Sequence, residues 1–350
     1  MHKTLFLLSA VFCFTTASAA SPREFLSFVR ERHWAVTGEK FELALERIRL
    51  ERRSRQPVIL SHGFFVGSSF LNLDEDHSLA QYLAREGFDV WNLSFRGTGR
   101  SLNPLKGGPK TWSLDDMIEK DIEAVIAYVR KETNSPRVGW VGFEMGGLVA
   151  YGYLQRSSRP DLGALVTLGA PVTFTHPEQE PMKRLLKLEE SPTWKRIFLY
   201  LNGPFFGRLI PFFPKIERLF YNSENIEDEV KLRFLEEALT EIHPGVLEHL
   251  LLTIKRGEFI SKNGTFSYRK NLSRVRLPIL LIGGEKDPLA PQAALRTVHR
   301  SVGSQDRTVR IFGPRSKDSA AYGHFDLVLG KKAKEEVFPV IAKWLRLRLG

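Results

Sequence analysis

The sequence predicts an α/β fold, with a mostly parallel sheet flanked by helices, and two observations lead to this prediction. Short apolar runs, typical of strands buried on both faces, alternate with helix-like segments; they are residues 57–60, 138–141, 162–168 and 278–282. The alternation stops between Val172 and about Arg274, where the pattern is helical and rich in Phe and Pro, and then resumes. We therefore expect a core domain (residues 21–171 and 275–350) interrupted by a helical cap insertion (residues 172–274).

The first 20 residues have the pattern of a secretory signal peptide. Lys3 precedes the apolar run 5–14, and the small residues 17–20 follow it. The run is shorter than the ~18 apolar residues that a membrane-spanning helix needs. We expect cleavage after Ala19 or Ala20 and an exported protein, periplasmic or secreted. Cys13 is the only cysteine, so the mature chain would have no disulfide, thiol nucleophile or cysteine metal site.

The remaining elements follow the alternation in order. We expect an amphipathic helix at 22–36, because Phe25, Phe28 and Val29 fall on one helical face. Apolar and polar residues alternate at 41–46, which indicates a half-exposed strand. Ser113, followed by acidic residues, is typical of a helix N-cap. The other expected elements are helices at 78–85, 114–132 and 335–347 and strands at 88–93 and 308–312.

The formal net charge of +11, from 51 basic and 40 acidic residues, favours anionic partners. Basic residues concentrate at 47–55 and 331–348, so an anionic membrane surface is a possible partner, and the alternative is a basic exported protein without a specific anionic ligand. No nucleic-acid-binding motif accompanies this charge, and we expect no nucleic-acid partner. His/Cys ligand spacings and a phosphate-binding glycine loop are also missing from the sequence, so we expect no metal and no nucleotide cofactor.

The segment Gly142-Phe143-Glu144-Met145-Gly146-Gly147 lies between an apolar strand and a helix-like stretch. Strand, tight turn and helix are the setting of a nucleophile elbow, whose motif is G-x-S-x-G. The glycines are needed because a Cβ there would clash with neighbouring elements. Glu144 stands at the position of the nucleophilic serine.

Two further motifs follow later strands and would meet the elbow at the carboxyl edge of the sheet. Asp287 follows the strand at 279–282, and His324 precedes the last helix. Nucleophile position, acid and histidine thus appear in the order expected for a catalytic triad on this fold. Glu285 and Asp326 are weaker candidates for the acid.

The pair His62-Gly63 follows the strand at 57–60. In such folds the backbone N–H after this pair, and that of the residue after the nucleophile, bind the developing oxyanion. Phe64 and Met145 are therefore the expected oxyanion-hole residues.

With these motifs the chain resembles the α/β-hydrolase superfamily, and within it the acid-lipase branch of gastric and lysosomal lipases and their bacterial relatives. Besides His62-Gly63, the stretch 87–91 with Arg96-Gly97 matches the branch signature G-[YF]-D-V-W…RG, and 322–326 resembles its histidine segment with H-x-D. The resemblance is weak across the cap. It implies a lipid or another acyl ester as ligand, with Glu144, Asp287 and His324 at the catalytic positions.

Three roles remain open for Glu144. It could be a covalent nucleophile, as Asp is in haloalkane dehalogenases and epoxide hydrolases, although Glu is one methylene longer and the expected neighbours (Trp at 145, Pro at 65) are replaced by Met145 and Phe65. It could act as a general base for water. Alternatively, its carboxylate favours a protonated His324 and fills the oxyanion hole, which gives an inactive pseudo-hydrolase that binds a lipid or a protein.

The expected cap carries an apolar cluster suited either to shielding a lipid pocket, to touching a membrane, or to ordinary packing on the core. Its members are Phe205, Phe206, Leu209, Ile210, Phe212 and Phe213.

Overall fold

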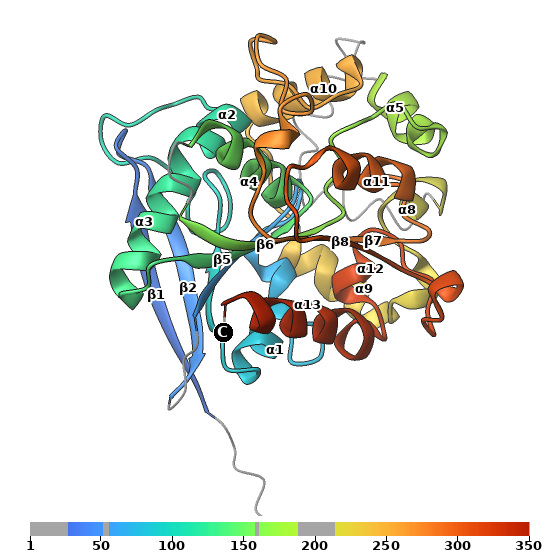
Figure 1. The fold of residues 1–350 in the computed structure, drawn as a ribbon, viewed down its shortest axis with the longest axis horizontal. Coiled ribbons are helices and arrows are strands. Elements are labelled where there is room, and N and C mark those ends of the chain that lie inside the picture. Colours follow the sequence, from blue (N-terminus) through green and yellow to red (C-terminus); the bar gives the residue numbers. More distant parts are fainter. Residues whose placement is uncertain (1–26, 52–55, 158–160, 188–213, 350) are drawn as a thin grey trace, which may run out of the picture.

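The computed structural model describes residues 27–51, 56–157, 161–187 and 214–349 (Figure 1). One sheet of order β1-β2-β4-β3-β5-β6-β7-β8 runs through them. β1 pairs antiparallel with β2, and β2 antiparallel with β4, whereas all the other neighbouring strands are parallel. The strands are β1 (Phe28–Val36), β2 (Glu42–Leu50), β3 (Pro57–Ser61), β4 (Asp89–Leu93), β5 (Val138–Phe143), β6 (Leu162–Leu168), β7 (Ile279–Gly284) and β8 (Arg307–Phe312). The expected mostly parallel sheet is confirmed.

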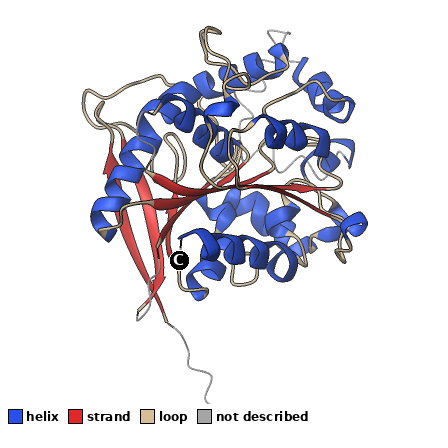
Figure 2. Ribbon diagram, viewed as in Figure 1, coloured by secondary structure: helices blue, strands red, loops and turns tan. Residues whose placement is uncertain are grey.

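Helices cover both faces of this sheet, with the strands as a layer between them (Figure 2). One face carries α1 (Leu79–Arg85), α9 (Asp228–Arg233), α12 (Asp326–Leu329) and α13 (Ala333–Leu349). The other carries α3 (Ile122–Thr133), α4 (Met145–Arg156), α10 (Pro244–Arg256) and α11 (Gln292–Ser301). Successive strand residues point to opposite faces, so Trp140 of β5 packs in one hydrophobic cluster and Val141 in the other.

The helix expected at 22–36 is wrong for residues 28–36, which form strand β1 (residues 22–26 lie outside the described ranges). β1 pairs with β2 along nine residues, from Phe28 opposite Leu50 to Val36 opposite Glu42. The alternation of exposed Trp34 and buried Ala35 fits this pairing. A short run of mixed polarity fits the apolar repeat of a helix as well as that of a strand, and pairing with the neighbouring strand decides between the two.

Local signals placed two other helices correctly. The Ser78 hydroxyl accepts a hydrogen bond from the backbone N–H of Gln81 at 2.9 Å and caps α1. Ser113 caps a continuous helical segment made of α2 (Leu114–Asp116), a π turn (Met117–Asp121) and α3. Its backbone N–H donates to the Asp116 carboxylate at 2.8 Å, which completes a capping box.

The described part of the expected cap is helical, with α5 (Glu180–Lys187), α8 (Pro214–Phe220), α9 and α10. Its side chains join the same two hydrophobic clusters as the sheet: Tyr221 and Phe234 pack in one and Val246 and Ile254 in the other. The apolar cluster expected at 205–213 lies outside the described residues. In the described ranges, none of the helices is both long and apolar enough to span a membrane.

Candidate active site

The elbow lies where β5 ends and α4 begins, and its backbone has the strained form that a nucleophile turn requires. Glu144 has φ 47° and ψ −107°, a region that residues with a Cβ rarely occupy. A Cβ on Gly142 would lie 2.4 Å from the carbonyl carbon of Gly146, and one on Gly146 would lie 2.3 Å from the Ser61 hydroxyl. One on Gly147 would lie 2.6 Å from Cβ of Ala170. The close approach of helix and strands therefore needs all three glycines.

The Glu144 carboxylate reaches the loop that follows β3. Its Oε2 accepts a hydrogen bond from the backbone N–H of Phe64 at 3.0 Å. A Cβ on Gly63 would lie only 2.4 Å from the same oxygen, so glycine at 63 makes room for the carboxylate. Met145, the second expected oxyanion donor, begins α4 directly after Glu144. One of the two expected donors is thus bonded to a side chain of the protein itself.

His62 holds this loop in place. Its buried ring contacts the Gly63 carbonyl through Nδ1 at 2.9 Å, and Nε2 accepts from the Phe95 backbone N–H at 3.1 Å. Since a carbonyl only accepts, the proton of the neutral ring sits on Nδ1. Burial lowers the pKa of His62 to about 4, so the ring is neutral and serves as a scaffold for the loop after β3.

The structure brings two of the expected site residues, His324 and Asp287, together in the interior. Nδ1 of His324 lies 2.7 Å from Oδ2 of Asp287, and both side chains are fully buried. The other carboxylate oxygen, Oδ1, accepts from the backbone N–H groups of Leu289 and Ala290, at 2.9 Å each. Gly169 leaves space for the imidazole, because a Cβ there would lie 2.6 Å from Cε1 of His324.

The carboxylates of the two weaker candidates for the acid, Glu285 and Asp326, accept hydrogen bonds from other groups than His324. Glu285 accepts from the backbone N–H of Arg315 at 3.0 Å. Asp326 accepts from the backbone N–H of Gly323 at 2.8 Å. The acid that contacts His324 is therefore Asp287.

Glu144 faces the second ring nitrogen of His324, the one that does not contact Asp287. Nε2 of His324 is 4.0 Å from Oε2 of Glu144, an ion-pair separation longer than a hydrogen bond. Burial lowers the pKa of His324, but the charges of Asp287 and Glu144 outweigh it and raise the pKa to about 10. At neutral pH the ring is therefore an imidazolium between two carboxylates, and it has no free lone pair with which to accept a proton.

Residues 56–315 match the family model described as alpha/beta hydrolase fold. The chain belongs to this family. A protein of Schizosaccharomyces pombe named as a probable lipase is 26% identical over 355 residues, which cover 90% of this chain and 77% of that one. Human lipase member K is 34% identical over 141 residues, 37% of this chain and 35% of that one. The expected lipase-like α/β-hydrolase is thereby confirmed.

Solved structures give the same fold. An esterase from Thermogutta terrifontis superposes with a TM-score of 0.61 at 19% identity, covering 91% of this hydrolase-fold chain and all of that one. At this identity the match shows the fold alone, and it agrees with the parallel sheet and its helical layers.

Two buried ion or hydrogen-bond networks support the site of this α/β-hydrolase and were not found by sequence reasoning. The first centres on Asp326, which accepts from the Asn225 side chain at 2.8 Å and the Asn222 backbone at 3.3 Å as well as from Gly323. It thereby joins the loop that carries His324 to the segment 222–225. Burial raises the pKa of Asp326 to about 6, against the lowering effect of these hydrogen bonds. The H-x-D pattern was the available signal.

The second network fixes the loop after β4. The buried Arg96 guanidinium donates from Nε to both carboxylate oxygens of Asp121, at 2.9 and 2.8 Å, and from Nη1 to Glu39 at 2.7 Å. Burial raises the pKa of Asp121 to about 6, although Arg96 opposes the shift. Arg96 of the branch signature therefore forms a buried structural ion pair with Asp121 in this hydrolase.

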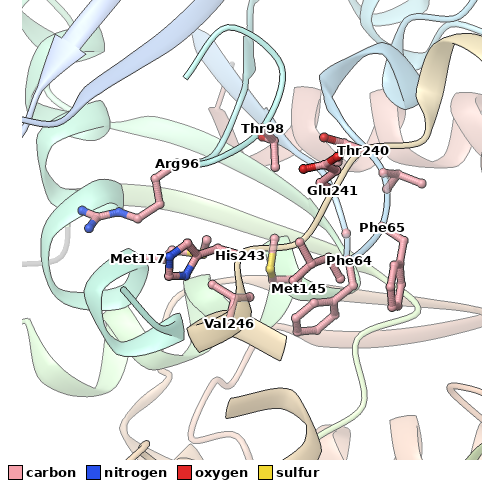
Figure 3. A pocket seen from close by; sticks show the side chains of 13 residues that line it. Phe64, Phe65, Arg96, Thr98, Met117, Met145, Thr240, Glu241, His243 and Val246 are labelled. Atoms are coloured by element: carbon pink, nitrogen blue, oxygen red, sulfur yellow. The ribbon is translucent and has the colours of Figure 1, made fainter. Parts of the chain in front are cut away.

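A small pocket adjoins the loop after β3 (Figure 3). The residues around it come from the loops after β3 and β4, the π turn at Met117, the elbow and the segment 240–246, and its volume is about 20 Å³, which is room for a single water. Its lining includes Phe64, Phe65, Met117, Met145, Ile242, His243 and Val246. Among the residues that the structure describes, there is no group of three or more His, Cys, Asp or Glu side chains that could hold a metal.

Proposed function

We propose that this lipase-like α/β-hydrolase-fold protein binds a lipid or another acyl-bearing molecule near Glu144 and does not hydrolyse it by a serine-type route. One observation carries the proposal: the Phe64 N–H, which would stabilise an ester's oxyanion, already holds the Glu144 carboxylate at 3.0 Å. The protonated His324 supports it, because an imidazolium cannot accept a proton from a nucleophile. The lipid class rests on the names of the relatives.

A second function, hydrolysis through Glu144, is favoured by the buried contact between Asp287 and His324 at 2.7 Å. In this mechanism Glu144 removes a proton from water, the resulting hydroxide adds to the acyl carbon, and the imidazolium of His324 protonates the departing alkoxide. The carboxylate would first have to leave the Phe64 N–H. The roles of Glu144, Asp287 and His324 in any turnover, and of Phe64 and Met145 as an oxyanion hole, are part of this proposal.

The decisive experiment compares the wild-type protein with Glu144→Ser on p-nitrophenyl esters of short and long acyl chains. We expect no turnover by the wild type and turnover at least ~10²-fold above it in Glu144→Ser, because the variant gains a hydroxyl, an empty Phe64 N–H and a less strongly protonated His324. Glu144→Ala is the matched control, since it empties the hole without adding a nucleophile.

Each outcome points to one of the two functions. Wild-type turnover that disappears in both Glu144→Gln and His324→Ala would replace the binding proposal with the Glu144 mechanism. Binding itself is measured by displacement of a fluorescent fatty-acyl probe from the wild type. Absence of binding to every acyl chain tested would refute the proposed function.

We also propose export, directed by residues 1–20. Expression of the full chain in a bacterial host followed by N-terminal sequencing of the extracytoplasmic fraction tests this. A mature N-terminus at Ala20 or Ser21 is the expected result, and retention of uncleaved chain in the cytoplasm would contradict it.

A further inference from the structure

Large hydrophobic side chains gather at one tip of the described surface. Six such side chains are exposed, and four of them lie at the end of β1 and in the loop that follows β4. They are Trp34 (45% exposed), Val36 (51%), Leu102 (57%) and Leu105 (40%). We call the exposed parts of residues 34–40 and 100–110 the hairpin-tip surface.

Backbone contacts hold these two segments together. The N–H of Leu105 donates to the Lys40 carbonyl at 2.9 Å, and Phe41 and Pro104 form an isolated β-bridge. Further along, the Ala44 N–H donates to the Ser101 hydroxyl at 2.8 Å, and Ala44 lies opposite Trp34 in the sheet. Ser101 therefore lies about two strand spacings, ~10 Å, from Trp34. Leu102 is the next residue along the chain. In Figure 1 this loop extends beside the upper ends of β1 and β2.

The same surface is basic. Residues 94–112 contain no Asp or Glu, and Arg100, Lys106 and Lys110 are exposed. None of these three side chains has an acidic partner in the part of the chain that the structure describes. The same is true of Lys40. The nearest acids along the hairpin are Glu39 and Glu42, and Glu39 is held by Arg96 and Lys120. Among the described residues, the hairpin-tip surface therefore carries four cations without an acidic partner, and its one acid, Glu39, is already paired.

In the described parts of the basic segments 47–55 and 331–348, several cations have acidic partners, and residues 52–55 lie outside the described residues. Arg47 is paired with Asp89 at 2.7 Å and with Glu31 at 3.1 Å. On α13, Arg348 is paired with Asp306 at 2.7 Å. These cations are committed to the fold, whereas those of the hairpin-tip surface are free to meet an external anion.

The hairpin-tip surface lies at the edge of the sheet that carries the elbow. β1 is antiparallel to β2, and β2 to β4, so β1 runs in the direction of the parallel strands. Val36 therefore ends β1 at the carboxyl edge, from which the loop after β4 and the turn at Glu144 also emerge. A planar partner on this surface would face the same edge as the candidate site.

We propose that the hairpin-tip surface docks the protein on a bilayer that contains anionic phospholipid. Exposed Trp and Leu side chains insert at the boundary of head groups and acyl chains, and surrounding Lys and Arg side chains contact anionic head groups. Each such cation strengthens partitioning about fivefold near an anionic leaflet. This contact is independent of any ligand at Glu144 and goes beyond the proposed function.

The test is co-sedimentation of the mature full-length chain with vesicles of phosphatidylcholine alone or mixed with phosphatidylglycerol. We expect binding to the mixed vesicles that weakens at high salt, because exposed charges are screened. Lys106→Glu/Lys110→Glu should reduce partitioning by more than ~10-fold, since two attractive charges become repulsive. Leu102→Ser/Leu105→Ser should reduce it by a similar factor through loss of apolar insertion.

Matched controls come from α13, where Leu347 is 72% exposed and Lys343 is also exposed. Leu347→Ser and Lys343→Glu should leave partitioning within about twofold of the wild type, and circular dichroism verifies the fold of every variant. Equal binding to both vesicle types, no binding to either, or loop variants that bind like the wild type would each overturn the proposal. Loop-dependent retention on heparin without vesicle binding would also overturn it, in favour of a polyanion site.

Discussion

Replacing Glu144 with Gln removes a negative charge 4.0 Å from Nε2 of His324 while nearly preserving the size of the side chain. The Gln carbonyl can still accept from the Phe64 N–H, so the geometry of the turn should be retained. We expect the pKa of His324 to fall from about 10 toward its ordinary value of 6.5.

The size of this effect follows from the distance. Two unit charges 4 Å apart attract by ~4 kcal/mol at an effective dielectric constant of 20. His324 is fully buried and the Glu144 side chain is 19% exposed, so solvent screens the pair only in part. The remaining charge of Asp287, at 2.7 Å from Nδ1, should keep the pKa at or above its ordinary value despite burial.

The pKa is measured by NMR titration of the imidazole ring, with the His324 signal assigned by its loss in His324→Ala. The same titration midpoint in the wild type and in Glu144→Gln would refute the ion-paired site. Stability gives an independent check. The folded pKa lies above the unfolded one, so the stabilisation is complete below pH 6.5 and is lost as pH rises through about 10. The unfolding free energy should fall over this range by at most ~1.4 kcal/mol per pH unit, and less in Glu144→Gln.

Two further substitutions test the surroundings of the site by urea denaturation. Gly63→Ala should destabilise the wild type by ~1–3 kcal/mol, because the new Cβ lies 2.4 Å from Oε2 of Glu144, and by less in a Glu144→Ser background; equal losses in both would contradict this contact. Asp121→Asn should cost ~3–5 kcal/mol, because it leaves the buried Arg96 with Glu39 as its remaining acidic partner. A cost below ~1 kcal/mol would mean that Glu39 alone balances Arg96.

The central strands could be predicted from sequence because burial on both faces imposes an uninterrupted apolar run on each of them. The positions of Glu144, Asp287 and His324 could be predicted for a related reason. Parallel strands end at one edge, so the residues that follow them converge there whatever separates them in sequence. The contact between Asp287 and His324 spans 37 positions and is nevertheless where the strand order requires it.

Contacts that depend on the pairing of edge strands and on the cap could not be predicted in this way. The pattern of residues 28–36 favours a helix, but these residues form strand β1, because pairing with β2 determines their conformation. Arg47 of the basic cluster is held against Asp89, a contact that depends on the pairing of β2 with β4 and is not visible in the sequence, and residues 52–55 of that cluster lie outside the described ranges. Asp326 was recognised only as a second choice for the acid, because its partners Asn222 and Asn225 are about 100 residues away.

The elbow glycines have a consequence for how position 144 can be used. Gly142, Gly146 and Gly147 fix the close approach of helix and strands through contacts that involve only backbone and neighbouring residues, and none of these contacts includes the side chain at 144. The conformation of the turn is therefore largely independent of the functional group it carries. Carboxylate, hydroxyl, thiol and amide side chains could therefore be compared at position 144, each with the same histidine and acid beside it. Differences in reactivity among these variants would then arise from the side-chain group alone.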